Sequence, residues 1–198
     1  KFIFHKRIMK ENNKVSVLMP AYNCSKFIGQ AIESILNQSY KNLELLICDD
    51  KSKDSTLKII KSYNDSRIKI FSNDKNIGYL RTWNKLISKS NGDFITFQDA
   101  DDSCELNRIQ LLIQEFNNNP NLGICGSNYI RIDEKNNKYD VSNFCLNNNS
   151  IFNKMPNSYE FLGSALMIKK EVYESIGGYH TFFDFMGEED HYWLYLCA

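Results

Sequence analysis

Three aspartates lie close together where a short strand-like stretch meets a polar segment. The stretch covers residues 92–102 and ends in Asp99, Asp101 and Asp102. Carboxylates gathered where a buried strand meets solvent repel one another and lose hydration, and a divalent cation would offset this cost. The same side chains could instead accept hydrogen bonds from the first-turn amides of a following helix. By itself, the stretch leaves a metal site and an acidic helix cap equally open.

Strand-like and helix-like segments alternate along the first two thirds of the chain. Apolar strand-like runs occur at residues 15–19, 43–48, 68–71, 93–97 and 122–125. The segments between the first four runs have helical spacing, and in residues 25–38 the apolar side chains fall on one helical face. This alternation predicts right-handed crossovers and an α/β fold whose mostly parallel sheet is covered by helices on both faces. A later helix is predicted from Lys170 to Ile176.

Polar residues follow the predicted strands at the edge where ligands bind in such sheets. These strand ends carry residues 20–23, Asp49 and Asp50, residues 72–73, and residues 99–102. The turn after the first strand matches neither GxGxxG nor GxxxxGK[ST], so neither a dinucleotide site nor a P-loop is predicted. Without a glycine-rich cradle, a metal held by aspartates is the natural way to neutralise a diphosphate.

Composition limits the partners and the compartment. The 198 residues suffice for one large domain or two small ones, and 24 basic side chains balance 24 acidic ones. No overall field therefore favours nucleic acid. The six cysteines form no CxxC pair, which predicts free thiols in a reducing compartment. No apolar run approaches the roughly 20 residues that span a bilayer, so we expect a cytoplasmic protein.

The ends and the middle of the chain have weaker patterns. Residues 1–14 mix basic and apolar side chains and are expected to form an N-terminal extension, with a peripheral membrane contact as the alternative. Because the chain starts at Lys1 without Met and stops at Ala198 inside a helix-like pattern, we expect a fragment whose missing ends can carry an anchor. Residues 130–157 are expected to form asparagine-rich loops with an edge hairpin.

Taken together, these motifs resemble those of the family 2 glycosyltransferases, which have the GT-A fold. The match is ordered along nearly the whole chain: Val15 to Asn23 with its P-x-Y-N turn, Asp49 to Thr56 beside D-D-G-S-x-D-x-[ST], Asn76-Ile77-Gly78 with Asn84-Lys85 beside N-x-G and R-N-x-[GA], the D-x-D form Asp99 to Asp102, Gly177-Gly178-Tyr179 beside G-G-[FY], and Glu189-Asp190 beside the E-D pair. A D-x-D motif alone is weak evidence, whereas the ordered set is strong. Two departures are Lys51 in place of the usual glycine and a second possible register of the E-D pair at Glu188-Glu189.

The resemblance implies a domain division and a reaction. Residues 15–198 would form the GT-A domain, with residues 15–128 binding a nucleotide sugar, residues 129–198 forming a smaller acceptor-binding half, and a truncated C-terminus. A hexosyl or N-acetylhexosaminyl group would pass from a nucleoside diphosphate sugar, with UDP as the expected nucleotide, to a hydroxyl of a glycan or lipid-linked acceptor. Transfer would invert the anomeric carbon. A place at the inner face of the plasma membrane would suit such an acceptor.

The resemblance also implies roles for individual residues. Asp101 would ligate Mn²⁺ or Mg²⁺, and Asp102 would support the metal site from behind. Asp190 would be the general base, with Glu189 beside it. Nucleotide contacts are implied for Pro20, Ala21, Tyr22, Asn23, Asp49, Asp50, Asn76, Gly78, Asn84, Asp99 and Ala100. Acceptor contacts are implied for Gly163, Ser164, Gly178 and Tyr179.

Two other functions fit parts of the pattern. A sugar nucleotidyltransferase also uses metal-bound aspartates on an α/β sheet, but it would normally carry a glycine-rich basic loop after the first strand. The turn at residues 20–25 has only Lys26 nearby. A nucleotide-sugar-binding module without activity of its own is the second alternative, and only the absence of transfer and of donor hydrolysis would identify it.

Overall fold

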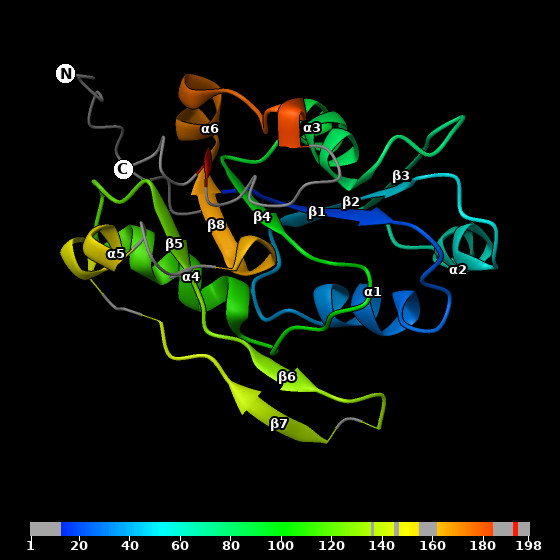
Figure 1. The fold of residues 1–198 in the computed structure, drawn as a ribbon, viewed down its shortest axis with the longest axis horizontal. Helices are drawn as coiled ribbons and strands as arrows, with labels where there is room; N and C mark the ends of the chain where they lie inside the picture. Colours follow the sequence, from blue (N-terminus) through cyan, green and yellow to red (C-terminus); the bar gives the residue numbers. More distant parts are fainter. Residues whose placement is uncertain (1–12, 136, 145–146, 155–161, 184–191, 194–198) are drawn as a thin grey trace.

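The computed structural model describes residues 13–135, 137–144, 147–154, 162–183 and 192–193 (Figure 1). Six strands form the main sheet in the order β3-β2-β1-β4-β8-β5. Their bounds are β1 (Val15–Ala21), β2 (Leu43–Asp49), β3 (Ile68–Ser72), β4 (Phe94–Phe97), β5 (Ile124–Gly126) and β8 (Leu166–Lys169). The pairs among β3, β2, β1 and β4 are parallel, whereas β8 runs antiparallel to both β4 and β5.

The strand order reverses between β1 and β4, since β2 and β3 lie on one side of β1 and β4 lies on the other. In open α/β sheets this reversal leaves a crevice at the carboxyl ends of the two strands, where ligands bind. The residues that follow β1 and β4 are the turn at residues 20–23 and the acidic turn at residues 99–102. The topology therefore brings two of the predicted site segments to one place.

Helices cover both faces of the main sheet, as predicted (Figure 1). On one face lie α1 (Ile28–Leu36), α2 (Thr56–Ser62) and α4 (Arg108–Asn118), and on the other lie α3 (Tyr79–Lys89) and α6 (Lys170–Ile176). Alternation along the strands separates the two cores, because Leu45 and Ile47 pack on the first face whereas Leu46 and Cys48 pack on the second. Each face thus has its own hydrophobic core.

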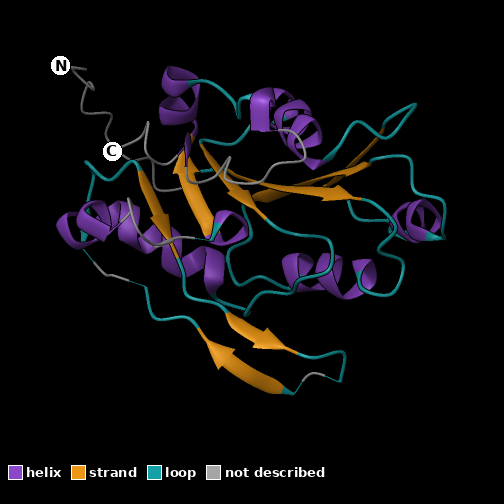
Figure 2. Cartoon of the chain, viewed as in Figure 1, coloured by secondary structure: helices purple, strands orange, loops and turns teal. Residues whose placement is uncertain are grey.

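Two expectations for residues 130–157 are corrected. The strands β6 (Ile130–Ile132) and β7 (Lys138–Val141) form a separate two-stranded sheet rather than an edge of the main sheet (Figure 2). The asparagine-rich segment contains a helix, α5 (Asn148–Lys154), where loops were expected. The carboxamide oxygen of Asn147 accepts a hydrogen bond from the Ser150 amide at 2.9 Å and so caps the first turn of this helix.

Four of the six cysteines lie among the described residues. Cys24, Cys48, Cys104 and Cys125 are free thiols. Burial raises the pKa of Cys48 to about 11 and that of Cys125 to about 12, so both remain protonated at neutral pH. Within the described ranges, no helix has the length and apolarity to cross a membrane.

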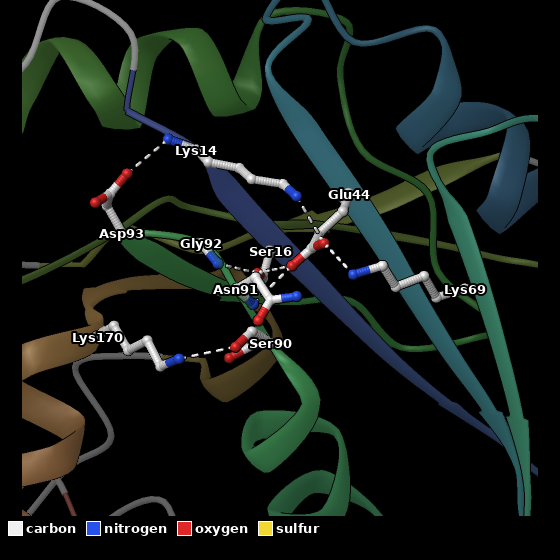
Figure 3. A network of polar contacts seen from close by, with 9 residues as sticks. All are labelled: Lys14, Ser16, Glu44, Lys69, Ser90, Asn91, Gly92, Asp93 and Lys170. Carbon is white, nitrogen blue, oxygen red and sulfur yellow. Dashed lines mark hydrogen bonds and ion pairs between the residues drawn. The ribbon is translucent and has the colours of Figure 1, made fainter.

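A buried glutamate ties together the amino ends of the parallel strands (Figure 3). The side chain of Glu44 in β2 is 3% exposed. Its Oε2 lies 2.8 Å from the Nζ of Lys14 and 2.8 Å from the Nζ of Lys69. Its Oε1 accepts hydrogen bonds from the Ser16 hydroxyl at 2.7 Å and the Asn91 amide at 2.8 Å. Ser16 belongs to β1 and Lys69 to β3, whereas Lys14 precedes β1 and Asn91 precedes β4. The network therefore fixes the sheet at the end opposite the predicted site.

The network makes Glu44 an acid-sensitive element of the fold. Burial would raise the pKa of the Glu44 carboxyl, but its four hydrogen bonds lower the pKa from 4.5 to about 2. The pKa is thus lower in the folded protein than in the unfolded chain. Its stabilising contribution is therefore fully present above about pH 4.5 and is lost as the pH falls through about 2.

Glu44→Gln is expected to lower the free energy of unfolding at pH 7 by about 2 kcal/mol. The two lysines would lose their carboxylate partner, and the side-chain NH₂ group of the glutamine would face hydrogen-bond donors. Urea unfolding between pH 7 and pH 2 measures the effect. The difference from the wild type should shrink below about pH 4.5. Glu115→Gln, at an exposed position of α4, is the control and should change stability by less than about 0.5 kcal/mol. A constant difference across the whole pH range would contradict the role of Glu44.

Candidate functional site

The loops that follow β1 and β2 are joined by polar contacts. The Asn23 side-chain oxygen accepts a hydrogen bond from the Lys53 amide at 2.8 Å, and the Asn23 amide donates to the Ser52 hydroxyl at 3.0 Å. The Asp54 carboxylate accepts from the Ser25 amide at 3.0 Å. The acidic segment after β2 therefore holds the turn after β1 in place and also supplies negative charge.

Two residues of these loops have left-handed backbone conformations. Asn23 has a φ of 50°, which asparagine tolerates, and Lys51 has a φ of 64°. Lys51 thus takes the conformation for which the family's usual glycine is suited, at a steric cost of about 1 kcal/mol. The replacement of glycine adds a long basic side chain to this turn.

Asp50 is a buried hydrogen-bond acceptor at the start of α3. It is 3% exposed. Its Oδ1 accepts from the Asn73 side chain at 2.7 Å and the Ile77 amide at 3.0 Å, and its Oδ2 accepts from the Gly78 amide at 2.9 Å. Asp50 therefore positions the residues that lead into α3, whatever it contributes to nucleotide binding.

Asp50→Ala is expected to lower the free energy of unfolding by about 2 to 4 kcal/mol, because three donors would each lose a buried carboxylate acceptor. Urea unfolding, with UDP binding measured on the same samples, tests this. Asp74→Ala changes an exposed position in the segment between β3 and α3 that Asp50 contacts. It should change stability by less than about 0.5 kcal/mol. Equal stability of the two variants would mean that Asp50 serves the ligand alone.

The neighbouring Asp49 has spare hydrogen-bonding capacity. It is 2% exposed, and its Oδ2 accepts from the Ser52 amide at 3.2 Å. Its Oδ1 is buried without a hydrogen-bond partner among the described residues. An unpaired carboxylate oxygen is costly to bury, so a ligand that donates to Asp49 would remove a penalty already present in the protein. The orphaned oxygen supports the predicted nucleotide contact at Asp49.

Asn84, predicted to contact the nucleotide, is hydrogen-bonded to Tyr179, which is predicted to contact the acceptor. Its side-chain nitrogen donates to the Tyr179 carbonyl at 2.8 Å, and its oxygen accepts from the Tyr179 amide at 3.0 Å and the Tyr173 hydroxyl at 2.9 Å. A Cβ at Gly178 would lie 2.6 Å from the same oxygen, so this close approach requires glycine. Three of the predicted residues, Asn84, Gly178 and Tyr179, thus form one unit. Asn76 is exposed, and its side-chain oxygen accepts from the Gly78 amide at 3.2 Å.

A pocket of about 160 Å³ lies where α3, the end of β4 and η1 (Gly163–Ala165) meet. It is lined by Tyr79, Trp83, Phe97, Asp99, Leu162, Gly163, Ser164 and Tyr179. The pocket brings Asp99, predicted on the nucleotide side, together with three of the four predicted acceptor residues. Gly178 lies directly before the lining residue Tyr179.

Two aromatic residues of α3, Tyr79 and Trp83, line this pocket and were not predicted as site residues. The ring of Trp83 packs edge-on against Phe97, with centroids 4.7 Å apart. Tyr79 is 44% exposed, and it follows Gly78 in the N-x-G motif, which was the only available signal. Flat aromatic faces beside a carboxylate suit a sugar ring, which has apolar C–H faces and hydroxyl edges.

The acidic turn lies beside the turn that follows β1. Burial raises the pKa of the Cys24 thiol; hydrogen bonds with Thr56 and the Tyr22 backbone lower it, and the charges of Asp54 and Asp101 raise it. Burial also raises the pKa of Asp102, and the charge of Asp101 adds to this effect. Negative charge is therefore concentrated at the strand ends where the topology leaves a crevice.

This donor set fits a divalent cation shared with a ligand. Within the described ranges, no group of three or more His, Cys, Asp or Glu side chains could hold a metal ion alone. Mg²⁺ is usually held by one or two carboxylates together with substrate phosphates and water. Asp101 is exposed at the turn and Asp99 lines the pocket, so both carboxylates are accessible to such an ion.

Asp190 and Glu189 lie outside the described residues. Trp193 follows Asp190 by three positions and is described. It is 2% exposed, its indole nitrogen donates to the Gly177 carbonyl at 2.9 Å, and its ring centroid lies 5.7 Å from that of Tyr179. Trp193, three positions after the predicted base, therefore lies beside a residue that lines the pocket.

The chain is similar to known proteins over most of its length. The family model described as Glycosyl transferase family 2 matches residues 16–177. EpsE of Bacillus subtilis (strain 168) is 31% identical over 182 residues, which cover 87% of this chain and 62% of EpsE. UDP-Glc:alpha-D-GlcNAc-diphosphoundecaprenol beta-1,3-glucosyltransferase WfgD of Escherichia coli is 32% identical over 181 residues, which cover 91% of this chain and 68% of WfgD.

Solved structures share the fold. The mannosyltransferase PcManGT from Pyrobaculum calidifontis, in complex with GDP-Man and Mn²⁺, has a TM-score of 0.70 at 18% identity over 94% of this chain and 52% of that chain. S. aureus TarS 1-349 in complex with UDP has a TM-score of 0.69 at 19% identity over 91% of this chain and 53% of that chain. The expected GT-A class of α/β fold is confirmed. The chain spans about half the length of these solved proteins and 62% and 68% of the two relatives.

Proposed function

Because the chain belongs to glycosyl transferase family 2, we propose that it transfers a sugar from a nucleoside diphosphate sugar to a hydroxyl group. The observation that carries this proposal is the pocket in which Asp99, at the end of β4, faces Ser164 and Tyr179 of the predicted acceptor side. Donor and acceptor must meet within bonding distance for transfer, and a pocket shared by the two sets of residues provides this meeting place.

The nucleotide would bind along the ends of β1 and β2. Asp49 has a buried oxygen free to accept a hydrogen bond from the base or the ribose, and Asp50 fixes the adjacent start of α3. UDP is the nucleotide we propose, since the name of WfgD specifies UDP-Glc and TarS was solved with UDP. A hexosyl or N-acetylhexosaminyl group would be the part transferred.

Asp101 would hold Mn²⁺ or Mg²⁺, with Asp99 close to the diphosphate and Asp102 behind the turn. When bound, the ion would act as a Lewis acid for the departing diphosphate. The name of the PcManGT structure, which contains GDP-Man and Mn²⁺, supports this choice of metal. The role left to the protein is to fix the turn in one conformation.

The acceptor would enter the aromatic pocket with its hydroxyl toward Asp99. Tyr79, Trp83 and Tyr179 supply ring faces for a glycan, and the name of WfgD suggests a lipid-linked sugar diphosphate as one acceptor class. Asp190 would take the proton from the hydroxyl, with Glu189 beside it. One base and no protein nucleophile imply single displacement, which inverts the anomeric carbon.

A thermal-shift panel tests donor binding. UDP-Glc, UDP-GlcNAc and GDP-Man are each added with and without Mn²⁺, because a ligand that binds only the native state raises apparent stability by mass action. We expect a UDP-sugar with Mn²⁺ to give the largest shift. The same small shift from all three sugars, unchanged by Mn²⁺, would count against the proposal.

A turnover assay on the full-length protein separates transfer from the two alternatives. Release of UDP from UDP-Glc in the presence of an alkyl-linked α-GlcNAc diphosphate would support transfer. Release of pyrophosphate from UTP and a sugar 1-phosphate would instead identify a nucleotidyltransferase. Donor binding with neither transfer nor hydrolysis would identify a binding module.

A further inference from the structure

Arg108 is a buried cation whose hydrogen bonds to the described residues all go to neutral oxygens. It is 9% exposed and is the first residue of α4. Its Nη1 donates to the Gln98 side-chain oxygen at 3.0 Å, and its Nη2 donates to the Thr96 hydroxyl at 3.0 Å, the Phe97 carbonyl at 3.1 Å and the Ser164 carbonyl at 2.9 Å. The guanidinium fork therefore spans two segments that are far apart in the sequence.

Both segments contribute residues to the lining of the pocket. Phe97 and Asp99 line it from β4, and Ser164 lines it from η1. The Gln98 side chain, which accepts from Arg108, also donates to the Asp99 carbonyl at 3.3 Å. Arg108 thus reaches the first residue of the acidic turn through Gln98 and the acceptor-side turn directly.

Local stability alone does not account for an arginine at this position. A positive charge in the first turn of a helix opposes the helix dipole, and burial of a cation is costly. The Nε atom of Arg108 is also buried without a hydrogen-bond partner among the described residues. Burial lowers the pKa of Arg108, whereas the nearby Cys104, Asp99 and Asp102 raise it. Residues that break local rules in this way are expected at functional sites.

We propose that Arg108 is a positioning residue that holds the acidic turn at residues 99–102 and the turn at Ser164 in one fixed arrangement. This role rests on the proposed function, since it concerns the diphosphate end of the donor. The nucleoside contacts are proposed to come from the ends of β1 and β2. The hydrogen bonds of Arg108 go to other segments, at residues 96–98 and Ser164. Loss of Arg108 should therefore weaken the metal-dependent part of donor binding and spare the rest.

Arg108→Lys tests the role, because lysine keeps the charge but lacks the planar fork. Calorimetry measures UDP binding with and without Mn²⁺, and urea unfolding measures stability in parallel. We expect UDP affinity without metal to change less than about threefold. The affinity with Mn²⁺ should fall by about 10- to 100-fold, as is typical when a group that orients metal ligands is lost.

Arg67→Lys is the matched control. Its guanidinium forms a similar fork on Asp65, with nitrogens at 3.0 and 2.8 Å, next to the amino end of β3. Binding in this variant should match the wild type. If Arg108→Lys folds poorly, Gln98→Leu removes one acceptor of the fork and should give a smaller loss of the same selective kind.

Two results would overturn the role of Arg108. One is Mn²⁺-dependent affinity in Arg108→Lys equal to that in Arg67→Lys. The other is an equal loss of affinity with and without metal that follows the folded fraction, which a purely structural arginine would give. Absence of Mn²⁺-dependent UDP binding in the wild type would instead remove the proposed function, and the role of Arg108 would fall with it.

Discussion

Asp101→Asn is expected to abolish most of the Mn²⁺-dependent part of UDP binding, a loss of about a hundredfold or more. A metal that bridges a diphosphate contributes several kcal/mol, and a carboxamide offers one neutral oxygen in place of a carboxylate. Asp101 is exposed at the strand-end turn, so the substitution should leave the free energy of unfolding within about 0.5 kcal/mol of the wild type. Calorimetry of UDP binding with and without Mn²⁺ measures the effect.

Two further variants make this test specific. Asp74→Asn changes an exposed aspartate in another segment and should keep the full metal dependence. Asp102→Asn should weaken the metal dependence less than Asp101→Asn, because Asp102 is proposed to support the site without contact to the ion. Unchanged Mn²⁺-dependent binding in Asp101→Asn would show that the metal has other ligands.

The sequence predicted the sheet well because its signals are local. A buried parallel strand is a short apolar run, and four such runs separated by helical patterns allow few topologies. The strand ends then follow, and with them the positions of Asp50 and Asp99. The predicted strand at residues 122–125 shifted to β5 (Ile124–Gly126), and β8 joined the sheet antiparallel, since strand pairing at an edge depends on contacts that periodicity does not encode.

Side-chain partners far apart in the sequence could not be predicted in the same way. Glu44 lies inside an apolar strand, and only the folded sheet brings Lys14 and Lys69 to it. Asn84 matched a motif but contacts Tyr179, 95 residues further along the chain. Arg108 follows the acidic turn closely in sequence, but its proposed role depends on its hydrogen bond to Ser164, 56 residues further along the chain. Such residues are recognised only when the elements that carry their partners are in place.

Asp190→Asn is expected to slow sugar transfer by about 10²- to 10⁴-fold at saturating donor, which is the usual loss when a general base is removed. Donor binding should stay within about threefold of the wild type, because the donor contacts are proposed to come from the ends of β1, β2 and β4. Asp190 is outside the described residues, and the support for its role is the anchoring of Trp193 beside Tyr179. The measurement is the rate of UDP release with a glycan acceptor, together with calorimetry of UDP binding.

The matched variants Glu189→Gln and Glu188→Gln decide between the two registers of the E-D pair. If Asp190 is the base, Glu188→Gln should retain near-normal turnover, and Glu189→Gln should lose less than Asp190→Asn. A selective loss in Glu189→Gln with near-normal turnover in Asp190→Asn would establish the other register, because only the residue that accepts the proton lowers the rate without lowering donor affinity. Near-normal turnover in all three variants would require a base from another part of the protein.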